Sequence, residues 1–259
     1  MHVGILGYGT IGRAIAAGLR EHDAVRSIAA TTRRGISLDD PAVTMSASNA
    51  ELATHCDVLF ACVKPFQLEG VLRDVAPFLK PETVLVSTAA SVRLDQLHEW
   101  TNGHRLIVRA MPNMPCRIGE GMTVLCARDL PPEKLELARS LFATLGRALV
   151  IDESLMDAAT GLSGCGPAYI YLVIEALTDA GVKLGFSHAV ARELVAQTVL
   201  GSARMVLESD EHPAALKMAV TTPAGCTVDG LMELEDGKLR STLLRAAVAA
   251  ATRSAELAS

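Results

Sequence analysis

The chain has 259 residues, of which half are apolar, a fifth are charged and 3% are aromatic. This composition excludes a disordered protein, because burial of so much apolar surface offsets the entropy lost on folding. The length suits one large domain or two domains of ordinary size. The formal net charge of −5 argues against a surface for nucleic acid or anionic membranes, since both need a basic face. Charged residues interrupt every apolar run before it reaches the roughly 20 residues of a membrane span.

Short apolar runs alternate with helix-length segments through residues 1–151, which indicates a mostly parallel sheet covered by helices. We predict strands at 3–6, 27–31, 58–62, 84–87, 106–110 and 123–127. A helix is predicted over 11–21. Others should begin at Pro65 and at Pro131-Pro132, because proline is favoured in the first helical turn.

After Ile151 the β-branched runs disappear, and alanine, leucine and glutamate at helical spacing continue almost to the end of the chain. We therefore predict two domains, an α/β domain over 1–151 and an all-α domain over 152–259. Predicted helices span 153–162, 167–184, 187–207, 212–220, 226–234 and 238–257. The two longest contain small residues that allow close helix packing, within one chain or in a homodimer, and we favour the homodimer. These residues are Ala176, Ala180, Ala191, Ala196, Gly201 and Ala203.

Cysteine and histidine spacing predicts neither disulfides nor a metal site. The six cysteines include no C-x-x-C pair, and the seven histidines lack the spacing of metal ligands on a helix. Scattered cysteines of this kind are typical of small buried residues in a reducing compartment. Residues 1–6 carry no basic segment of a signal peptide, so we expect a cytoplasmic protein.

Residues 7–12 read G-x-G-x-x-G, directly after a predicted strand and at the start of a predicted helix. The first glycine permits a tight turn, the second lets a pyrophosphate approach the backbone, and the third lets helix and strand pack closely. The pyrophosphate would then lie on the unpaired N–H groups of the helix. A glycine-rich turn can also simply join two elements, but this context favours dinucleotide binding. The predicted contacts are Gly7, Gly9, Thr10, Ile11 and Gly12.

The end of the second predicted strand indicates which dinucleotide binds. An NAD site has an acidic residue there, whereas this chain has Thr31-Thr32-Arg33-Arg34. Two hydroxyls and two guanidinium groups suit a ribose 2′-phosphate, so we predict NADPH, with NADH as the weaker alternative. The alternative interpretation of these residues is a solvated basic loop.

Several further segments match one family in order and spacing, and two of the motifs in them, MPN-x-P and GPAY, are more specific than the glycine loop. They are ACVKP at 61–65, RAMPNMP at 109–115, GEGM at 119–122, LSGCGPAY at 162–169, EALTDAGVKLG at 175–185, AQTVLG at 196–201, HP at 212–213 and TPAGCT at 222–227. With GYGTIGRAIAAGL at 7–19, they cover essentially the whole chain. The sequence resembles the pyrroline-5-carboxylate reductase family.

This resemblance implies an enzyme that reduces the cyclic imine 1-pyrroline-5-carboxylate to L-proline with NAD(P)H, in proline biosynthesis. It also implies a Rossmann-type, doubly wound, mostly parallel sheet followed by an all-α dimerisation domain, with dimers that can assemble into larger rings. Val63, Lys64 and Pro65 would line the nicotinamide ribose, and Met111, Pro112 and Asn113 would lie beside the nicotinamide. The substrate carboxylate would bind backbone N–H groups of a loop that contains Thr222, Ala224, Gly225, Cys226 and Thr227.

The chemistry of such a site agrees with the residues present. Hydride attack on C=N is easier when the nitrogen accepts a hydrogen bond, and the Thr227 hydroxyl can donate one. The loop before it suits an anion, because N–H groups point outward at a helix start. The plainer interpretation is a helix N-terminus with Thr222 as cap and Pro223 in the first turn. Both interpretations can hold together.

Four departures from the family pattern bear on the choice of substrate. They are Met114 where the family usually has threonine, Cys165 in place of serine, Ala224 in place of glycine, and Met218-Ala219 in place of an acidic stretch. We expect Met114 to remove a polar contact and Ala224 to narrow the carboxylate loop. A redox role for Cys165 and Cys226 is disfavoured, because hydride transfer needs no thiol.

Three other functions remain as alternatives. A reductase of a related cyclic imino acid would differ only in the shape of its pocket. A non-catalytic NADP-binding homologue would have lost Asn113, Thr227 or the glycine loop, and none is lost. A hydroxyacid dehydrogenase would need a lysine early in the second domain, but residues 151–180 contain none.

Overall fold

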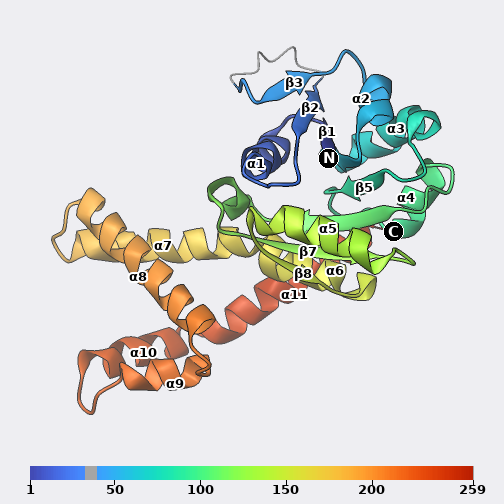
Figure 1. The fold of residues 1–259 in the computed structure, drawn as a ribbon. Helices are drawn as coiled ribbons and strands as arrows, with labels where there is room; N and C mark the ends of the chain where they lie inside the picture. Colours follow the sequence, from blue (N-terminus) through green and yellow to red (C-terminus); the bar gives the residue numbers. More distant parts are fainter. Residues whose placement is uncertain (33–39, 259) are drawn as a thin grey trace. The chain divides into compact units, whose positions relative to one another are not determined.

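The computed structural model describes residues 1–32 and 40–258. They form two compact units (Figure 1). The sheet unit comprises Met1–Cys165 together with the chain from Val248 onward, and the helical unit comprises Gly166–Ala247. The predicted domain boundary between residues 151 and 152 stays a prediction.

One sheet of eight strands forms the centre of the sheet unit, in the order β3-β2-β1-β4-β5-β6-β7-β8. All neighbours are parallel except β6 and β7, which are antiparallel. The chain passes outward from β1 through β2 to β3, then returns to β4 on the other side of β1. This reversal confirms the predicted doubly wound, mostly parallel sheet. The strands are β1 (His2–Leu6), β2 (Ser27–Thr31), β3 (Val43–Met45), β4 (Val58–Ala61), β5 (Val84–Ser87), β6 (Ile107–Pro112), β7 (Gly121–Ala127) and β8 (Gly146–Val150).

Helices cover both faces of this sheet, so its strands are apolar on both sides. One face packs on α1 (Thr10–Leu19) and α5 (Pro132–Ala143), and the other on α2 (Asn49–His55), α3 (Pro65–Val75) and α4 (Leu94–Trp100). Successive side chains of β4 alternate between the two cores, with Phe60 on the first face and Leu59 on the second. Phe60 meets Phe142 of α5 edge to face, with ring centroids 5.7 Å apart.

The structure adds elements that the sequence did not predict. Strand β3 has only three residues, and in β8 only Ala148 is buried, so neither shows a clear apolar run. The helix predicted over 153–162 is interrupted. It consists of η3 (Glu153–Leu155), α6 (Met156–Ala159) and the π-helical turn η4 (Thr160–Gly164). Short 3₁₀ helices also occur at η1 (Ala76–Phe78) and η2 (Met114–Ile118).

A buried arginine ties this interrupted segment to the sheet. Arg109 of β6 is 3% exposed, and its guanidinium lies 3.4 Å from a carboxylate oxygen of Glu153 and 3.8 Å from one of Asp157. The hydroxyl of Ser254, near the end of α11 (Leu239–Leu257), donates to Asp157 at 2.7 Å. Because a buried cation is costly without partners, this network holds α6 and the end of α11 on the sheet.

The helical unit confirms the helices predicted after residue 166 to within a few residues. It contains α7 (Gly166–Lys183), α8 (His188–Glu208), α9 (Pro213–Ala219), α10 (Cys226–Asp236) and the first part of α11. Helices α7 and α8 approach closely at Gly181 and Ala191. A Cβ added at Gly181 would lie only 2.7 Å from the Cβ of Ala191. Most large apolar side chains of this unit are exposed, and Leu184 reaches 79%. No helix in the described parts of the chain has the length and apolar content needed to cross a membrane.

Candidate active site: a dinucleotide cavity and a carboxylate loop

The glycine loop joins β1 to α1 at the edge of the sheet where parallel strands end. Gly7 has a φ of +92°, a conformation that favours glycine, and its N–H donates to the carbonyl of Thr31 at 3.1 Å. A Cβ added at Gly12 would lie 2.4 Å from the carbonyl oxygen of Gly7. The third glycine therefore allows α1 to pack against the loop, as the motif predicts.

The second glycine leaves room for a ligand. Gly9 is the N-cap of α1 and makes no side-chain cap, and a Cβ added there would meet nothing within 4 Å. The N–H groups in the first turn of a helix have no partners within the helix, and they carry its positive dipole end. This open, uncapped helix start fits the pyrophosphate of a dinucleotide.

The cavity in front of this loop has a volume of about 880 Å³, which suits a ligand of dinucleotide size. It lies at the switch point between β1 and β4, where open α/β sheets bind their ligands. Eleven residues predicted to contact the cofactor line it: Gly7, Gly9, Thr10, Ile11, Thr31, Thr32, Val63, Lys64, Pro65, Met111 and Pro112. Gly12 and Asn113 are not among the lining residues, and Arg33 and Arg34 lie outside the described residues.

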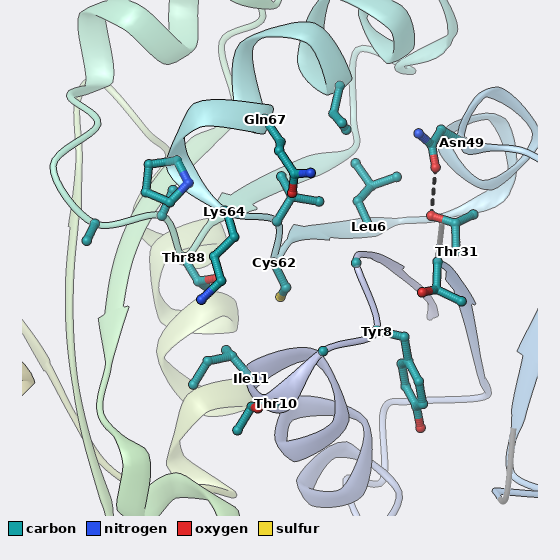
Figure 2. A pocket seen from close by; sticks show the side chains of 18 of the residues that line it. Leu6, Tyr8, Thr10, Ile11, Thr31, Asn49, Cys62, Lys64, Gln67 and Thr88 are labelled. Atoms are coloured by element: carbon teal, nitrogen blue, oxygen red, sulfur yellow. Dashed lines mark hydrogen bonds between the residues drawn. The ribbon is translucent and has the colours of Figure 1, made fainter. Parts of the chain in front are cut away.

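Other lining residues were not predicted, although most follow a strand end. Thr88 comes directly after β5, and Asn49 begins α2 just after β3. The Thr31 hydroxyl donates to the side-chain oxygen of Asn49 at 2.6 Å (Figure 2). Because ligands bind at the carboxyl ends of parallel strands, the residue after the predicted strand 84–87 was the available signal for Thr88.

Figure 2 shows that Lys64, Cys62 and Thr88 form one side of this cavity, and Thr31 and Asn49 the other. Lys64 is the one charged side chain among the described lining residues, and no described carboxylate pairs with it. It precedes Pro65 at the start of α3. Burial raises the pKa of the Cys62 thiol to about 12, so this thiol stays protonated at neutral pH. The cavity wall is therefore neutral apart from one ammonium group.

The Asn113 side chain bonds to the backbone. Its amide nitrogen donates to the carbonyl of Ser163 at 3.1 Å, and its oxygen accepts from the N–H of Met122 at 2.9 Å. These partners occupy both ends of the amide group, which leaves less capacity for a direct contact with a cofactor.

The loop predicted to bind the carboxylate is a tight turn before α10, in the helical unit. The N–H of Gly225 donates to the carbonyl of Thr222 at 3.0 Å, and Ala224 has a φ of +57°. Helix α10 begins at Cys226 with Gly225 as N-cap and no side-chain cap. The interpretation of Thr222 as the helix cap is therefore wrong, because the turn separates it from the helix. Thr227 lies in the first turn of α10.

The departures from the family pattern fall in different places. Met114 is 46% exposed at the start of η2 and is not among the lining residues of the cavity. Cys165 follows the π-helical turn, and its N–H donates to the carbonyl of Thr160 at 2.8 Å. Met218, near the end of α9, is 63% exposed. Among the described residues, no group of three or more His, Cys, Asp or Glu side chains could hold a metal ion.

The doubly wound sheet, the glycine loop and the cavity at the switch point define a dinucleotide-binding protein of the Rossmann type. Two family models match the chain. Residues 2–91 match an NADP oxidoreductase family that is coenzyme F420-dependent, and residues 153–257 match the pyrroline-5-carboxylate reductase dimerisation family.

Relatives match over nearly the whole chain. Pyrroline-5-carboxylate reductase of Pisum sativum is 39% identical over 98% of this chain and 95% of its own length. The Corynebacterium melassecola protein of that name is 37% identical over 98% of both chains. A crystal structure of Plasmodium falciparum pyrroline carboxylate reductase with NADP bound, at 35% identity, has a TM-score of 0.90 and covers 100% of this chain and 98% of its own. The chain belongs to the pyrroline-5-carboxylate reductase family.

Proposed function

We propose that this protein reduces the C=N bond of 1-pyrroline-5-carboxylate to give L-proline, with NADPH as hydride donor. The observation that carries this proposal is the combination of family relatives along the whole chain with a dinucleotide cavity lined by eleven predicted contacts. A related structure holds NADP, which supports the cofactor. The cytoplasmic location expected from the sequence belongs to the same proposal.

The cofactor preference rests on residues at the end of β2. Thr31 and Thr32 line the cavity on the side where the second strand of such folds meets the adenosine ribose. Arg33 and Arg34 follow directly in the sequence. Two guanidinium groups can bind a 2′-phosphate with charge-assisted hydrogen bonds, so we propose NADPH over NADH.

The substrate would bind at the turn before α10. Backbone N–H groups at this uncapped helix start can hold a carboxylate, because nothing in the turn occupies them as a side-chain cap. When bound, the reduced cofactor supplies a hydride to the imine carbon. The Thr227 hydroxyl donates a hydrogen bond to the imine nitrogen. As the hydride adds to the carbon, this nitrogen takes the electron pair of the C=N π bond together with a proton from solvent water, and becomes the amine of proline.

The helical unit supports a homodimer. Exposed apolar side chains run along α7, α8 and α11, and this unit falls within the match to a dimerisation family. We propose that one protomer supplies the cofactor cavity and its partner supplies the turn at 222–227, and that dimers can assemble into a ring. Mixing an inactive Gly9 variant with an inactive Thr227 variant should then restore partial activity. No recovery after demonstrated subunit exchange would contradict shared sites.

The second candidate function is the reduction of a related cyclic imino acid. The observation that favours this candidate is Ala224. Its methyl group narrows a turn where the family usually has glycine, and the residue adopts a positive φ. The decisive experiment follows NADPH oxidation by the purified protein with five- and six-membered cyclic imino acids. We expect 1-pyrroline-5-carboxylate to react fastest and to yield proline. A faster six-membered substrate would establish the second candidate, and no oxidation with any imine would reject both.

A further inference from the structure

Asn113 joins two segments that are distant in sequence, the start of β7 and the π-helical turn η4. Its amide nitrogen faces the carbonyl of Ser163, which can only accept, and its oxygen faces the N–H of Met122, which can only donate. The two partners therefore determine the orientation of the amide group without ambiguity. No other standard side chain of this length can both donate and accept in this way.

The turn that Asn113 holds contacts the wall of the cofactor cavity. A Cβ added at Gly164, the last residue of η4, would lie 2.8 Å from the terminal methyl carbon of Met111. The Met111 side chain thus packs directly on the backbone of this turn. Single π-helical turns are rare and occur often at functional sites, because they change the direction of a helix locally.

Met111 and Pro112 line the cavity at the end of β6, whereas Thr31 and Thr32 line it at the end of β2. In dinucleotide folds the adenosine ribose lies at the end of the second strand. A dinucleotide bound in this orientation would extend its nicotinamide half across the switch point toward β4, β5 and β6. Met111 would then line the part of the cavity where the cofactor would transfer its hydride.

We infer that Asn113 is a positioning residue, which acts on the reaction through Met111 rather than by touching the cofactor. Asn113 holds η4 against β6 and thereby keeps Gly164 packed on Met111. This contact fixes the shape of the cavity at the end where hydride transfer would take place. Hydride transfer is sensitive to the distance and angle between donor and acceptor carbons, so a displaced wall slows the chemical step. This inference rests on the proposed function.

The test compares three variants of the full-length protein. Asn113→Ala removes both hydrogen bonds, and Asn113→Asp keeps the acceptor for Met122 but loses the donor to Ser163. Gly164→Ala leaves Asn113 intact and displaces the terminal methyl group of Met111, which an added Cβ would approach to 2.8 Å. Asp157→Asn is the matched control, because it loosens the same segment at Arg109, away from the cavity lining. The measurements are kcat per active site, the Kd of NADPH, the melting temperature and the isotope effect with NADPH deuterated at the transferred position.

We expect all three test variants to lower kcat by about tenfold and to raise the isotope effect, because hydride transfer becomes more rate-limiting. The Kd of NADPH should stay within about twofold, since the predicted contacts at the glycine loop and at the end of β2 are unchanged. Asp157→Asn should lower the melting temperature and leave kcat and the isotope effect unchanged.

Two results would overturn the inference. An unchanged isotope effect, with activity lost only in proportion to unfolded protein, would make Asn113 a purely structural residue. A large rise in the Kd of NADPH for Asn113→Ala would make it a direct cofactor contact. If the wild-type protein bound NADPH but reduced no imine, the proposed function would fail instead, and the comparison of NADPH affinities would still show whether Asn113 touches the cofactor.

Discussion

The two units of this chain bury their apolar residues to different extents. In the sheet unit, Ile15, Phe60 and Leu72 are at most 1% exposed, and two apolar cores lie on opposite faces of the sheet. In the helical unit, Leu172 is 65% exposed and Leu244 64%. Isolated proteins rarely leave so many large apolar side chains in water. The sheet unit therefore completes its core within one chain, whereas the exposed apolar faces of the helical unit fit the homodimer proposed above.

The largest expected effect follows from breaking the proposed dimer. The double variant Leu172→Glu with Leu244→Glu places charges on the exposed apolar faces of α7 and α11. Each buried leucine contributes about 1.5–3 kcal/mol, so we expect dissociation and loss of imine reduction. The sheet unit should still bind NADPH. Analytical ultracentrifugation and NADPH titration measure both, and a fully active dimer would contradict the role of these faces.

The second prediction tests the basic residues after β2. Replacing Arg33 and Arg34 with alanine should weaken NADPH far more than NADH, because a charge-assisted phosphate contact contributes about 1.5–3 kcal/mol. The affinities of both cofactors for wild type and variant provide the measurement. Equal losses of affinity for NADPH and NADH would contradict the proposal that these two arginines bind the 2′-phosphate.

A pair of glycine substitutions separates folding from cofactor binding in the sheet unit. Gly12→Ala brings a Cβ to 2.4 Å from the carbonyl of Gly7, and we expect a loss of about 3 kcal/mol in the free energy of unfolding. Gly9→Ala meets nothing within 4 Å, so its stability should stay near that of wild type. It should nevertheless bind NADPH weakly, because the methyl group occupies the approach of the pyrophosphate. Urea unfolding and NADPH titration distinguish the two, and equal stabilities would contradict the packing role of Gly12.

Thr227→Ala tests the helical unit's part in the reaction. Loss of one preorganised donor costs about 2–3 kcal/mol, so kcat should fall by one to two powers of ten while NADPH affinity is unchanged. Thr227→Ser should retain most activity, because it keeps the hydroxyl. An active alanine variant that folds normally would leave Thr227 with a packing role only.

The smallest effect is expected at the turn before α10. Ala224 adopts a φ of +57°, which glycine tolerates better, so Ala224→Gly should raise the free energy of unfolding by up to about 1 kcal/mol. It should also widen the turn, and we expect a broader range of imino acids to be reduced. Thermal unfolding and the imine panel provide the measurements. A less stable variant would show that the flexibility of glycine outweighs the relief of strain.

Local sequence signals determined much of this protein. The glycine pattern at 7–12, the alternating apolar runs and the helical spacing after residue 151 each depend on neighbours in sequence. The structure confirms the elements they predict, except that the helix predicted over 153–162 is interrupted. Short-range periodicity is enough for these elements, because a strand or helix shows its buried face within a few residues. Strands β3 and β8 were missed, since three residues and a single buried side chain leave no such period.

Only the tertiary structure decided how distant residues share the site. Thr88 follows a predicted strand, but Asn49 follows β3, whose three residues show no period, and both reach the cavity because parallel strands end at one edge of the sheet. The family resemblance implies that Asn113 lies beside the nicotinamide, and the structure adds that its amide bonds to backbone groups of two other segments. Thr222 looked like a helix cap, but a turn closed by Gly225 separates it from α10. In each case the partner of a polar group depends on how the chain folds back on itself, which the identity of its neighbours in sequence does not specify.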